Sequence, residues 1–137
     1  MRTYRHPVKI HWGDLDPANI VFYPNYFAWF DESAQLLFAA AGLGWDALKV
    51  KHGVVGLPIV EAKARFLVPS GHHDEIVVES CIPRWNEKTF EVRHTVFKGA
   101  TRAVEGYEIR AWCKPHPDVP GKIKAFAIPP EVRAAFE

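Results

Sequence analysis

The feature that most constrains the fold is an apolar segment that begins at Pro24 and ends before Gly42. Proline suits the first position of a helix, because its missing N–H would have no partner there, and glycine commonly follows a helix end. Between them, apolar side chains surround nearly the whole helix, and Asp31, Glu32 and Gln35 are the main polar interruptions. A helix that is apolar all round is buried. The sequence therefore predicts one buried helix of roughly 18 residues, about 27 Å long.

Strands joined by short turns account for most of the remaining chain. The strands are expected at residues 4–12, 54–66, 76–84, 90–98, 103–113 and 123–128. A short helix is expected at residues 45–52, and Pro58 indicates a bulge or a sheet edge. The short turns at residues 86–87 and 98–99 favour antiparallel pairing of neighbouring strands.

These elements predict an α+β fold in which an antiparallel sheet of about five strands wraps around a long central α-helix. A chain of 137 residues is large enough for one hydrophobic core, so residues 1–137 are expected to form a single domain. A helix that is apolar all round also needs cover on the side away from the sheet. A second copy of the chain is the natural cover, so we expect at least a dimer.

Composition and charge exclude several classes of protein. Apolar residues make up 48% and charged residues 24%, which is typical of a globular chain. The formal net charge of +1 comes with no basic stripe, so no nucleic-acid partner is expected. No apolar run has the pattern of a signal peptide or the length of a membrane span, so we expect a cytoplasmic protein with no membrane partner. Cys81 and Cys113 are expected to be ordinary buried thiols, and the seven histidines show no metal spacing, so no metal site is predicted.

The loop before the helix places the carboxylate of Asp16 close to the helix start. An aspartate before a proline commonly closes an Asx turn, which is a structural role. The first N–H groups of a helix lack partners within it and carry the positive end of the helix dipole. A carboxylate beside such donors can also do chemistry on a carbonyl group, so both interpretations of Asp16 are open at this point.

The segment GDLDPANIVFYPNY, residues 13–26, closely resembles the active-site loop of hot-dog-fold acyl-CoA thioesterases of the 4-hydroxybenzoyl-CoA thioesterase family. Residues 53–60, GVVGLPIV, and residues 85–90, WNEKTF, resemble two further blocks of that family, so the resemblance covers about residues 4–128. It implies a sheet wrapped around a long helix, assembly into homodimers and homotetramers, and an active site at the subunit interface.

The resemblance implies that the chain is a thioester hydrolase. The expected substrate is an aromatic acyl-CoA such as 4-hydroxybenzoyl-CoA or benzoyl-CoA, or a short-to-medium acyl-CoA. The products are the carboxylic acid and free coenzyme A, and no cofactor is expected because coenzyme A is part of the substrate. Asp16 matches the catalytic aspartate, which acts as a nucleophile or as a base toward water, and the backbone N–H of Tyr23 matches the donor that polarises the thioester carbonyl.

Thioester hydrolysis can proceed with only the two groups named above, the Asp16 carboxylate and the Tyr23 N–H. A thiol with a pKa of about 8.5, judged from cysteine, leaves without a strong general acid. The reaction then needs an oxygen nucleophile or base and a donor for the developing oxyanion. The residues of the resembling blocks and of the helix that are expected to bind substrate are Asn19, Asn25, Asp31, Glu32, Leu57, Pro58 and Lys88.

Three positions depart from the family pattern. Asn19 stands where the type member has glycine, and Leu57 stands where it has a threonine near the acyl group. The arginine-rich block that binds the nucleotide phosphates reads Asn86-Glu87 here, and only Lys88 keeps a charge. For Asp31 and Glu32, contact with the acyl end and a structural ion pair, for example with Arg65, are equally weighted alternatives.

Three other functions compete with the acyl-CoA thioesterase. A hydratase or dehydratase acting on acyl thioesters usually needs a histidine, and the Asp16 loop has none. A thioesterase for acyl-carrier protein would show a basic docking face, and the reduced phosphate block leaves this alternative open. A non-catalytic acyl-thioester binding protein would tolerate the substitution Asp16→Asn.

Overall fold

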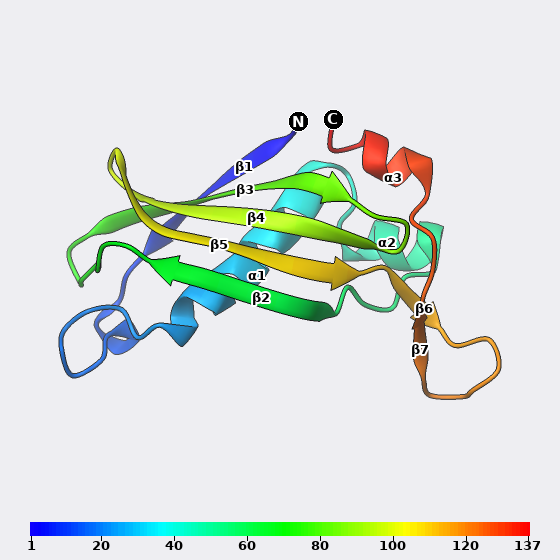
Figure 1. Cartoon of the computed structure of the whole chain (residues 1–137), viewed down its shortest axis with the longest axis horizontal. Coiled ribbons are helices and arrows are strands. Elements are labelled where there is room, and N and C mark those ends of the chain that lie inside the picture. Colours follow the sequence, from blue (N-terminus) through cyan, green and yellow to red (C-terminus); the bar gives the residue numbers. More distant parts are fainter.

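A computed structural model describes residues 1–137, in which a long helix lies across one face of a five-stranded antiparallel sheet (Figure 1). The main elements in chain order are β1 (Thr3–Lys9), α1 (Pro24–Ala40), α2 (Trp45–His52), β2 (Ile59–Phe66), β3 (Glu75–Trp85), β4 (Thr89–Lys98) and β5 (Thr101–Ala111). The smaller elements are the 3₁₀ turn η1 (Trp12–Asp14), strands β6 (Cys113–Pro115) and β7 (Ile123–Ala125), and α3 (Pro130–Ala134).

The sheet has the order β1-β3-β4-β5-β2, and all neighbouring strands are antiparallel. Buried and less buried residues alternate along β3, as the alternating pattern of residues 76–84 predicts. Strands β1 and β2 are the two edges of the sheet, and all residues of β2 except Ala64 are exposed. The β2 edge therefore carries unpaired backbone groups beside exposed apolar side chains.

Helix α1 begins at Pro24 and ends one residue earlier than predicted, and Gly42 follows with a φ of 77°. Its burial is one-sided in the single chain. The buried residues are Tyr26, Phe30, Ser33, Ala34, Leu37 and Phe38. The residues Ala28, Glu32, Gln35 and Ala39 recur at helical spacing and are exposed. The face of α1 away from the sheet is therefore uncovered in one chain, and its cover by a second copy stays a prediction.

Several strand boundaries differ from the prediction. β1 stops at Lys9, because the backbone N–H of His11 donates to the Asp14 carboxylate at 2.8 Å and the chain turns. β2 begins only after Pro58, which lacks the N–H that a sheet ladder needs. The predicted strand 103–113 is divided at Trp112 into β5 and β6. The predicted strand 123–128 shortens to β7, which pairs with β6 in a separate two-stranded sheet, and α3 was not predicted.

The core beneath α1 forms two apolar clusters, one of 13 buried residues and one of 10. Between them, polar side chains line the helix-facing side of the sheet: Ser80, His94, Glu108 and Arg110. Phe30 stacks on the His94 ring, with centroids 4.5 Å apart and an interplanar angle of 4°. Gly106 makes room for this contact, since a Cβ there would lie 2.7 Å from the Phe30 ring.

None of the three α-helices has the length and the continuous hydrophobicity that crossing a bilayer requires.

Candidate active site

The loop that precedes α1 is held by its own backbone and by the neighbouring segment. Leu15 and Val21 form an antiparallel bridge, and the Val21 N–H donates to the Ser70 carbonyl at 2.9 Å. The Asp14 carbonyl accepts from the Phe22 N–H at 2.8 Å and from the side-chain amide of Asn25 at 2.9 Å. These bonds fix the loop against the start of α1, and they give the amide nitrogen of Asn25 a partner inside the chain.

Asp16 closes the predicted Asx turn, and part of its carboxylate remains available. Oδ1 accepts from the Ala18 N–H at 2.8 Å, whereas Oδ2 accepts no hydrogen bond from the chain. The turn continues through Asn19, whose φ of 62° lies in the left-handed region. Asparagine tolerates this conformation better than most residues, which explains how a residue other than glycine can occupy this position. The structural role of Asp16 in the turn therefore leaves one of its carboxylate oxygens without a partner in the chain.

The helix start presents one free donor near this loop. Tyr23 caps α1, Pro24 has no N–H, and the Tyr23 N–H donates to no acceptor within the chain. Asp16 and Tyr23 line the same cavity of about 350 Å³, together with Tyr26, Phe66 and other residues. The Phe66 ring lies edge-on to the Tyr23 ring, with centroids 6.1 Å apart, and burial raises the pKa of the Tyr26 phenol. The structure thus brings together the two residues predicted to be catalytic.

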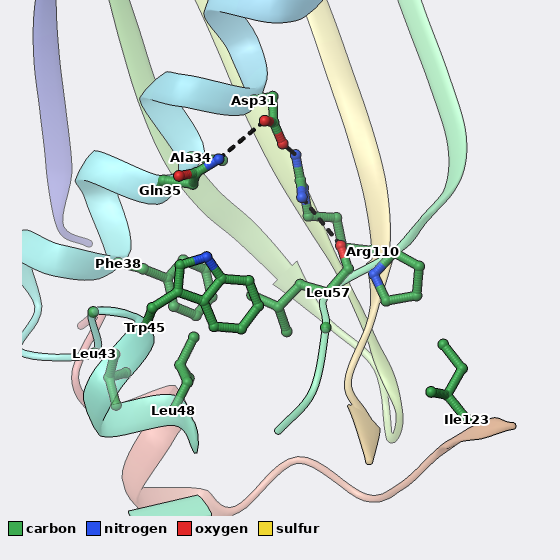
Figure 2. A pocket seen from close by; sticks show the side chains of 13 residues that line it. Asp31, Ala34, Gln35, Phe38, Leu43, Trp45, Leu48, Leu57, Arg110 and Ile123 are labelled. Carbon is green, nitrogen blue, oxygen red and sulfur yellow. Dashed lines mark hydrogen bonds and ion pairs between the residues drawn. The ribbon is translucent and has the colours of Figure 1, made fainter. Parts of the chain in front are cut away.

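A second cavity of about 260 Å³ lies toward the other end of α1, beside α2 (Figure 2). It contains three residues that were predicted to bind substrate, which are Asp31, Leu57 and Pro58. Its apolar wall consists mainly of Ala34, Phe38, Leu43, Trp45, Leu48 and Ile123. An apolar space with few polar groups is the usual form of a small-molecule site.

Arg110 fixes the polar end of this cavity. Its Nη2 atom lies 2.7 Å from Oδ1 of Asp31, and its Nη1 atom donates to the Leu57 carbonyl at 3.1 Å. Oδ2 of Asp31 accepts from the Gln35 amide at 3.0 Å. The Arg110 side chain is buried and its Nε has no partner, whereas the Asp31 side chain is 48% exposed. The alternative partner Arg65 is wrong for Asp31, because alternation along β2 places Arg65 on the outer face of the sheet.

Four of the seven predicted binding residues line neither cavity, which are Asn19, Asn25, Glu32 and Lys88. The Glu32 side chain is 60% exposed, and its Oε2 lies 3.5 Å from Nε2 of His6. Lys88 is exposed in the turn between β3 and β4, where its carbonyl accepts from the Trp112 N–H at 2.9 Å. In the single chain, neither Glu32 nor Lys88 is therefore placed to bind a ligand in either cavity.

The sequence interpretation missed Arg110 and Glu108, although a signal was present. On β5, both residues share the parity of the buried residue Val104, so their side chains face the core. Charged residues at core-facing positions are rare unless they are paired. The aromatic residue Trp45 was also missed as a cavity residue, because only the tertiary contact between α2 and α1 places it there.

Comparison with known proteins gives one family. The model of the thioesterase-like superfamily matches residues 10–136. A relative described as 4-hydroxybenzoyl-CoA thioesterase from Pseudomonas sp. (strain CBS-3) is 40% identical over 89 residues. That alignment covers 64% of this chain and 63% of the relative, so the matched part spans less than two thirds of that protein.

Solved structures extend the similarity over the full length of the chain. A complex of 4-hydroxybenzoyl-CoA with an aspartate-to-asparagine variant of 4-hydroxybenzoyl-CoA thioesterase superposes with a TM-score of 0.90. The two sequences are 30% identical, and the superposition covers 100% of both chains. A gentisyl-coenzyme A thioesterase superposes with a TM-score of 0.79 at 32% identity, covering 98% of each chain.

Proposed function

Because this chain belongs to the thioesterase-like superfamily and has its hot-dog fold, we propose that it hydrolyses an aromatic acyl-CoA to the carboxylic acid and free coenzyme A. The observation that carries the proposal is the cavity that Asp16 and Tyr23 line together. Within the chain, Oδ2 of Asp16 and the backbone N–H of Tyr23 at the helix start have no hydrogen-bond partner. The relatives named above act on hydroxylated aromatic CoA thioesters, which supports an aromatic acyl group here.

In the proposed reaction, the thioester carbonyl lies between Asp16 and the N–H of Tyr23. Oδ2 of Asp16 attacks the carbonyl carbon, or removes a proton from a water that attacks it. The negative charge on the carbonyl oxygen is stabilised by the Tyr23 N–H and the positive end of the α1 dipole. The tetrahedral intermediate collapses by releasing the thiolate of coenzyme A. Direct attack leaves a mixed anhydride that water then hydrolyses, so both routes give the same products.

The cavity at Asp31 accommodates the acyl group in this proposal. Its walls are apolar and aromatic, with Phe38, Trp45 and Leu57 among them, and its polar end is the Asp31 carboxylate. A carboxylate held by Arg110 remains an acceptor and suits an acyl group with a hydroxyl donor. Neither the acyl cavity nor the carbonyl site requires a metal or an organic cofactor for this chemistry.

We further propose that the active site is shared between two copies of the chain. The Asp31 cavity includes Pro58, just before β2, and the Asp16 cavity includes Phe66 at the end of β2 (Figure 1). If two β2 edges pair antiparallel about a two-fold axis, the start of each strand lies opposite the end of the other. In such a dimer, the acyl cavity of one copy lies opposite the Asp16 loop of the partner.

Exposed apolar residues around this edge support the shared site. Ile59 and Val60 at the start of β2 are 45% and 63% exposed, and Phe66 at its end is 49% exposed. The uncovered face of α1 offers a second contact, through which dimers could pair into the tetramer that the family resemblance implies. The nucleotide part of coenzyme A lies outside both cavities in this arrangement, where exposed cations such as Lys88 can meet its phosphates.

The proposal is tested by release of free thiol from a panel of acyl-CoA thioesters. The panel contains 4-hydroxybenzoyl-CoA, benzoyl-CoA, phenylacetyl-CoA and straight-chain acyl-CoAs of increasing length. We expect the aromatic thioesters to be cleaved with the highest kcat/KM. Cleavage of straight-chain thioesters alone would contradict the proposed acyl group, and no cleavage of any member would contradict the activity.

A further inference from the structure

We propose that a buried chain of hydrogen bonds, Ser80–His94–Glu108–Arg110, is a positioning device that fixes the Asp31 carboxylate for recognition of hydroxylated acyl groups. This inference rests on the proposed function and extends it to Ser80, His94 and Glu108, which lie outside the cavities of Asp16 and Asp31. We call these four residues the buried relay. Its role is to set the preference between acyl groups that carry a hydroxyl donor and those that do not.

The buried relay is continuous from the middle of the sheet to the cavity wall. The Ser80 hydroxyl lies 2.7 Å from Nδ1 of His94, and Nε2 of His94 lies 2.7 Å from Oε1 of Glu108. Oε2 of Glu108 accepts from Nη2 of Arg110 at 2.9 Å, and the same Nη2 lies 2.7 Å from Asp31. If Nε2–H donates to Glu108, then Nδ1 of His94 accepts the proton of the Ser80 hydroxyl. Three strands and one helix are thereby joined through side chains alone.

All four members of the relay are deeply buried. Ser80 and His94 are fully buried, Glu108 is 1% exposed and Arg110 is 7% exposed. They interrupt the sheet's inner face between the two apolar clusters. A buried ion pair is poor support for stability, because well-packed apolar residues of similar volume are often as good or better. The presence of this chain in the core of a small protein therefore indicates a role beyond packing.

The charges of the buried relay end at Asp31, because the guanidinium of Arg110 contacts the carboxylates of both Glu108 and Asp31. The carboxylates of Glu108 and Asp31 both contact Nη2 of the Arg110 guanidinium, so the buried Glu108 holds the nitrogen that Asp31 meets. The guanidinium is also tied to the Leu57 carbonyl, so its fork has little freedom to rotate. Asp31 therefore stays at one point of the cavity wall, and its remaining lone pairs are free to accept from a ligand.

Substitution of the relay residues that do not touch the acyl group can test positioning of Asp31 without removing a direct contact. Ser80, His94 and Glu108 do not line the acyl cavity, whereas Asp31 and Arg110 do. The hydrogen-bonded route from Ser80 or Glu108 to the acyl group passes through Arg110 and Asp31. A site built to hydrogen-bond a substrate hydroxyl discriminates strongly against the analogue without it, so loss of alignment should appear as lost discrimination.

The test compares kcat and KM for 4-hydroxybenzoyl-CoA and benzoyl-CoA in the full chain and in the variants Glu108→Gln and Ser80→Ala. We expect each variant to reduce the kcat/KM ratio of the hydroxylated to the plain thioester by about 10-fold, because a small misplacement of a positioning group is costly. The value for benzoyl-CoA should stay within about threefold of the wild type. Ser33→Ala is the matched control, since Ser33 is also fully buried, lies outside the relay and has no hydrogen-bond partner for its hydroxyl.

A double-mutant cycle with Asp31→Asn separates positioning from a general structural role. We expect Ser80→Ala to have no further effect on the ratio once Asp31 is changed, since the relay acts through that carboxylate. Equal losses for both thioesters, or an unchanged ratio in the folded variants, would overturn the inference alone. Absence of wild-type turnover of both thioesters would overturn the proposed function and this inference with it. If Glu108→Gln fails to fold, Ser80→Ala decides the result.

Discussion

The guanidinium of Arg110 lies 2.7 Å from the carboxylate of Asp31, and the two groups differ sharply in burial. The Arg110 side chain is 8% exposed, whereas the Asp31 side chain is 48% exposed at the cavity wall. A cation held inside the core therefore orients an anion that solvent and ligands can reach. Arg110 of the sheet thus positions the carboxylate of Asp31, which belongs to helix α1.

Replacement of Arg110 by methionine should destabilise the protein strongly. The change removes the buried donor that Glu108 shares with Asp31, and breaking a buried ion pair typically costs about 3–5 kcal/mol. Denaturant titration of the variant measures the free energy of unfolding. Arg102→Met is the matched control, because Arg102 is 63% exposed and its pair with Glu105 should contribute only about 0–1 kcal/mol. Equal losses for the two variants would contradict a special role for Arg110.

Trp45→Ala should weaken the binding of aromatic acyl groups. Trp45 lies on α2 at the wall of the acyl cavity, and its removal takes away a large apolar contact surface. We expect KM for benzoyl-CoA to rise by about 10-fold while kcat changes little, since uniform binding is lost. Val50→Ala tests the specificity of this effect, because Val50 lies on the same helix, is 88% exposed and does not line the cavity. An unchanged KM for the Trp45 variant would place the acyl group elsewhere.

Val60→Glu should weaken the association of two copies. Val60 is a 63% exposed residue on the edge strand β2, and charged side chains on an edge oppose pairing with another strand. Sedimentation velocity should show a shift from dimer or tetramer toward monomer, and specific activity should fall as the protein is diluted. The same substitution at Val119, an exposed residue between β6 and β7, should leave the association unchanged. A Val60→Glu dimer as stable as the wild type would contradict pairing through β2.

Asp74 should make the stability of the loop after β2 depend on pH. The backbone N–H of Gly71 donates to Asp74 at 2.7 Å, and this bond lowers the pKa of the Asp74 carboxyl below its ordinary value of 3.8. A folded-state pKa below the unfolded value contributes stability above pH 3.8, and the contribution is lost as pH falls through the folded pKa. The difference in unfolding free energy between wild type and Asp74→Asn should therefore be constant near neutral pH and shrink in acid. A difference that grows below pH 3.8 would contradict this sign.

Much of the fold could be predicted because its determinants are local. Pro24 and Gly42 bracket the long helix, and alternation along residues 76–84 identifies a half-buried strand. Strand ends were less accurate, since the end of β1 depends on a side-chain bond from Asp14 to the backbone of His11. The sheet of one chain covers only one face of α1, so burial of the other face depends on a second copy and stays a prediction.

Only the part of the candidate site that comes from a single segment of the chain could be predicted from the sequence. Asp16 and Tyr23 lie in a single loop, so their proximity follows from the sequence between them. The partner of Asp31 comes from β5, and no local pattern connects residues so far apart in the chain. Alternation along β2 could still have excluded Arg65 as that partner, because Ala64 faces the core and Arg65 therefore faces outward.

The most direct test of the central claim is the turnover of 4-hydroxybenzoyl-CoA by Asp16→Asn. Asparagine keeps an oxygen that can accept from the Ala18 N–H, so the Asx turn remains and only the charge is lost. Asp46→Asn on α2 is the matched control, because it removes a carboxylate that lines neither cavity. A folded Asp16 variant should lose about 10³-fold or more in kcat, because no other group replaces its nucleophile or base. Wild-type turnover by that variant would contradict catalysis by Asp16 and leave it a structural residue of the loop.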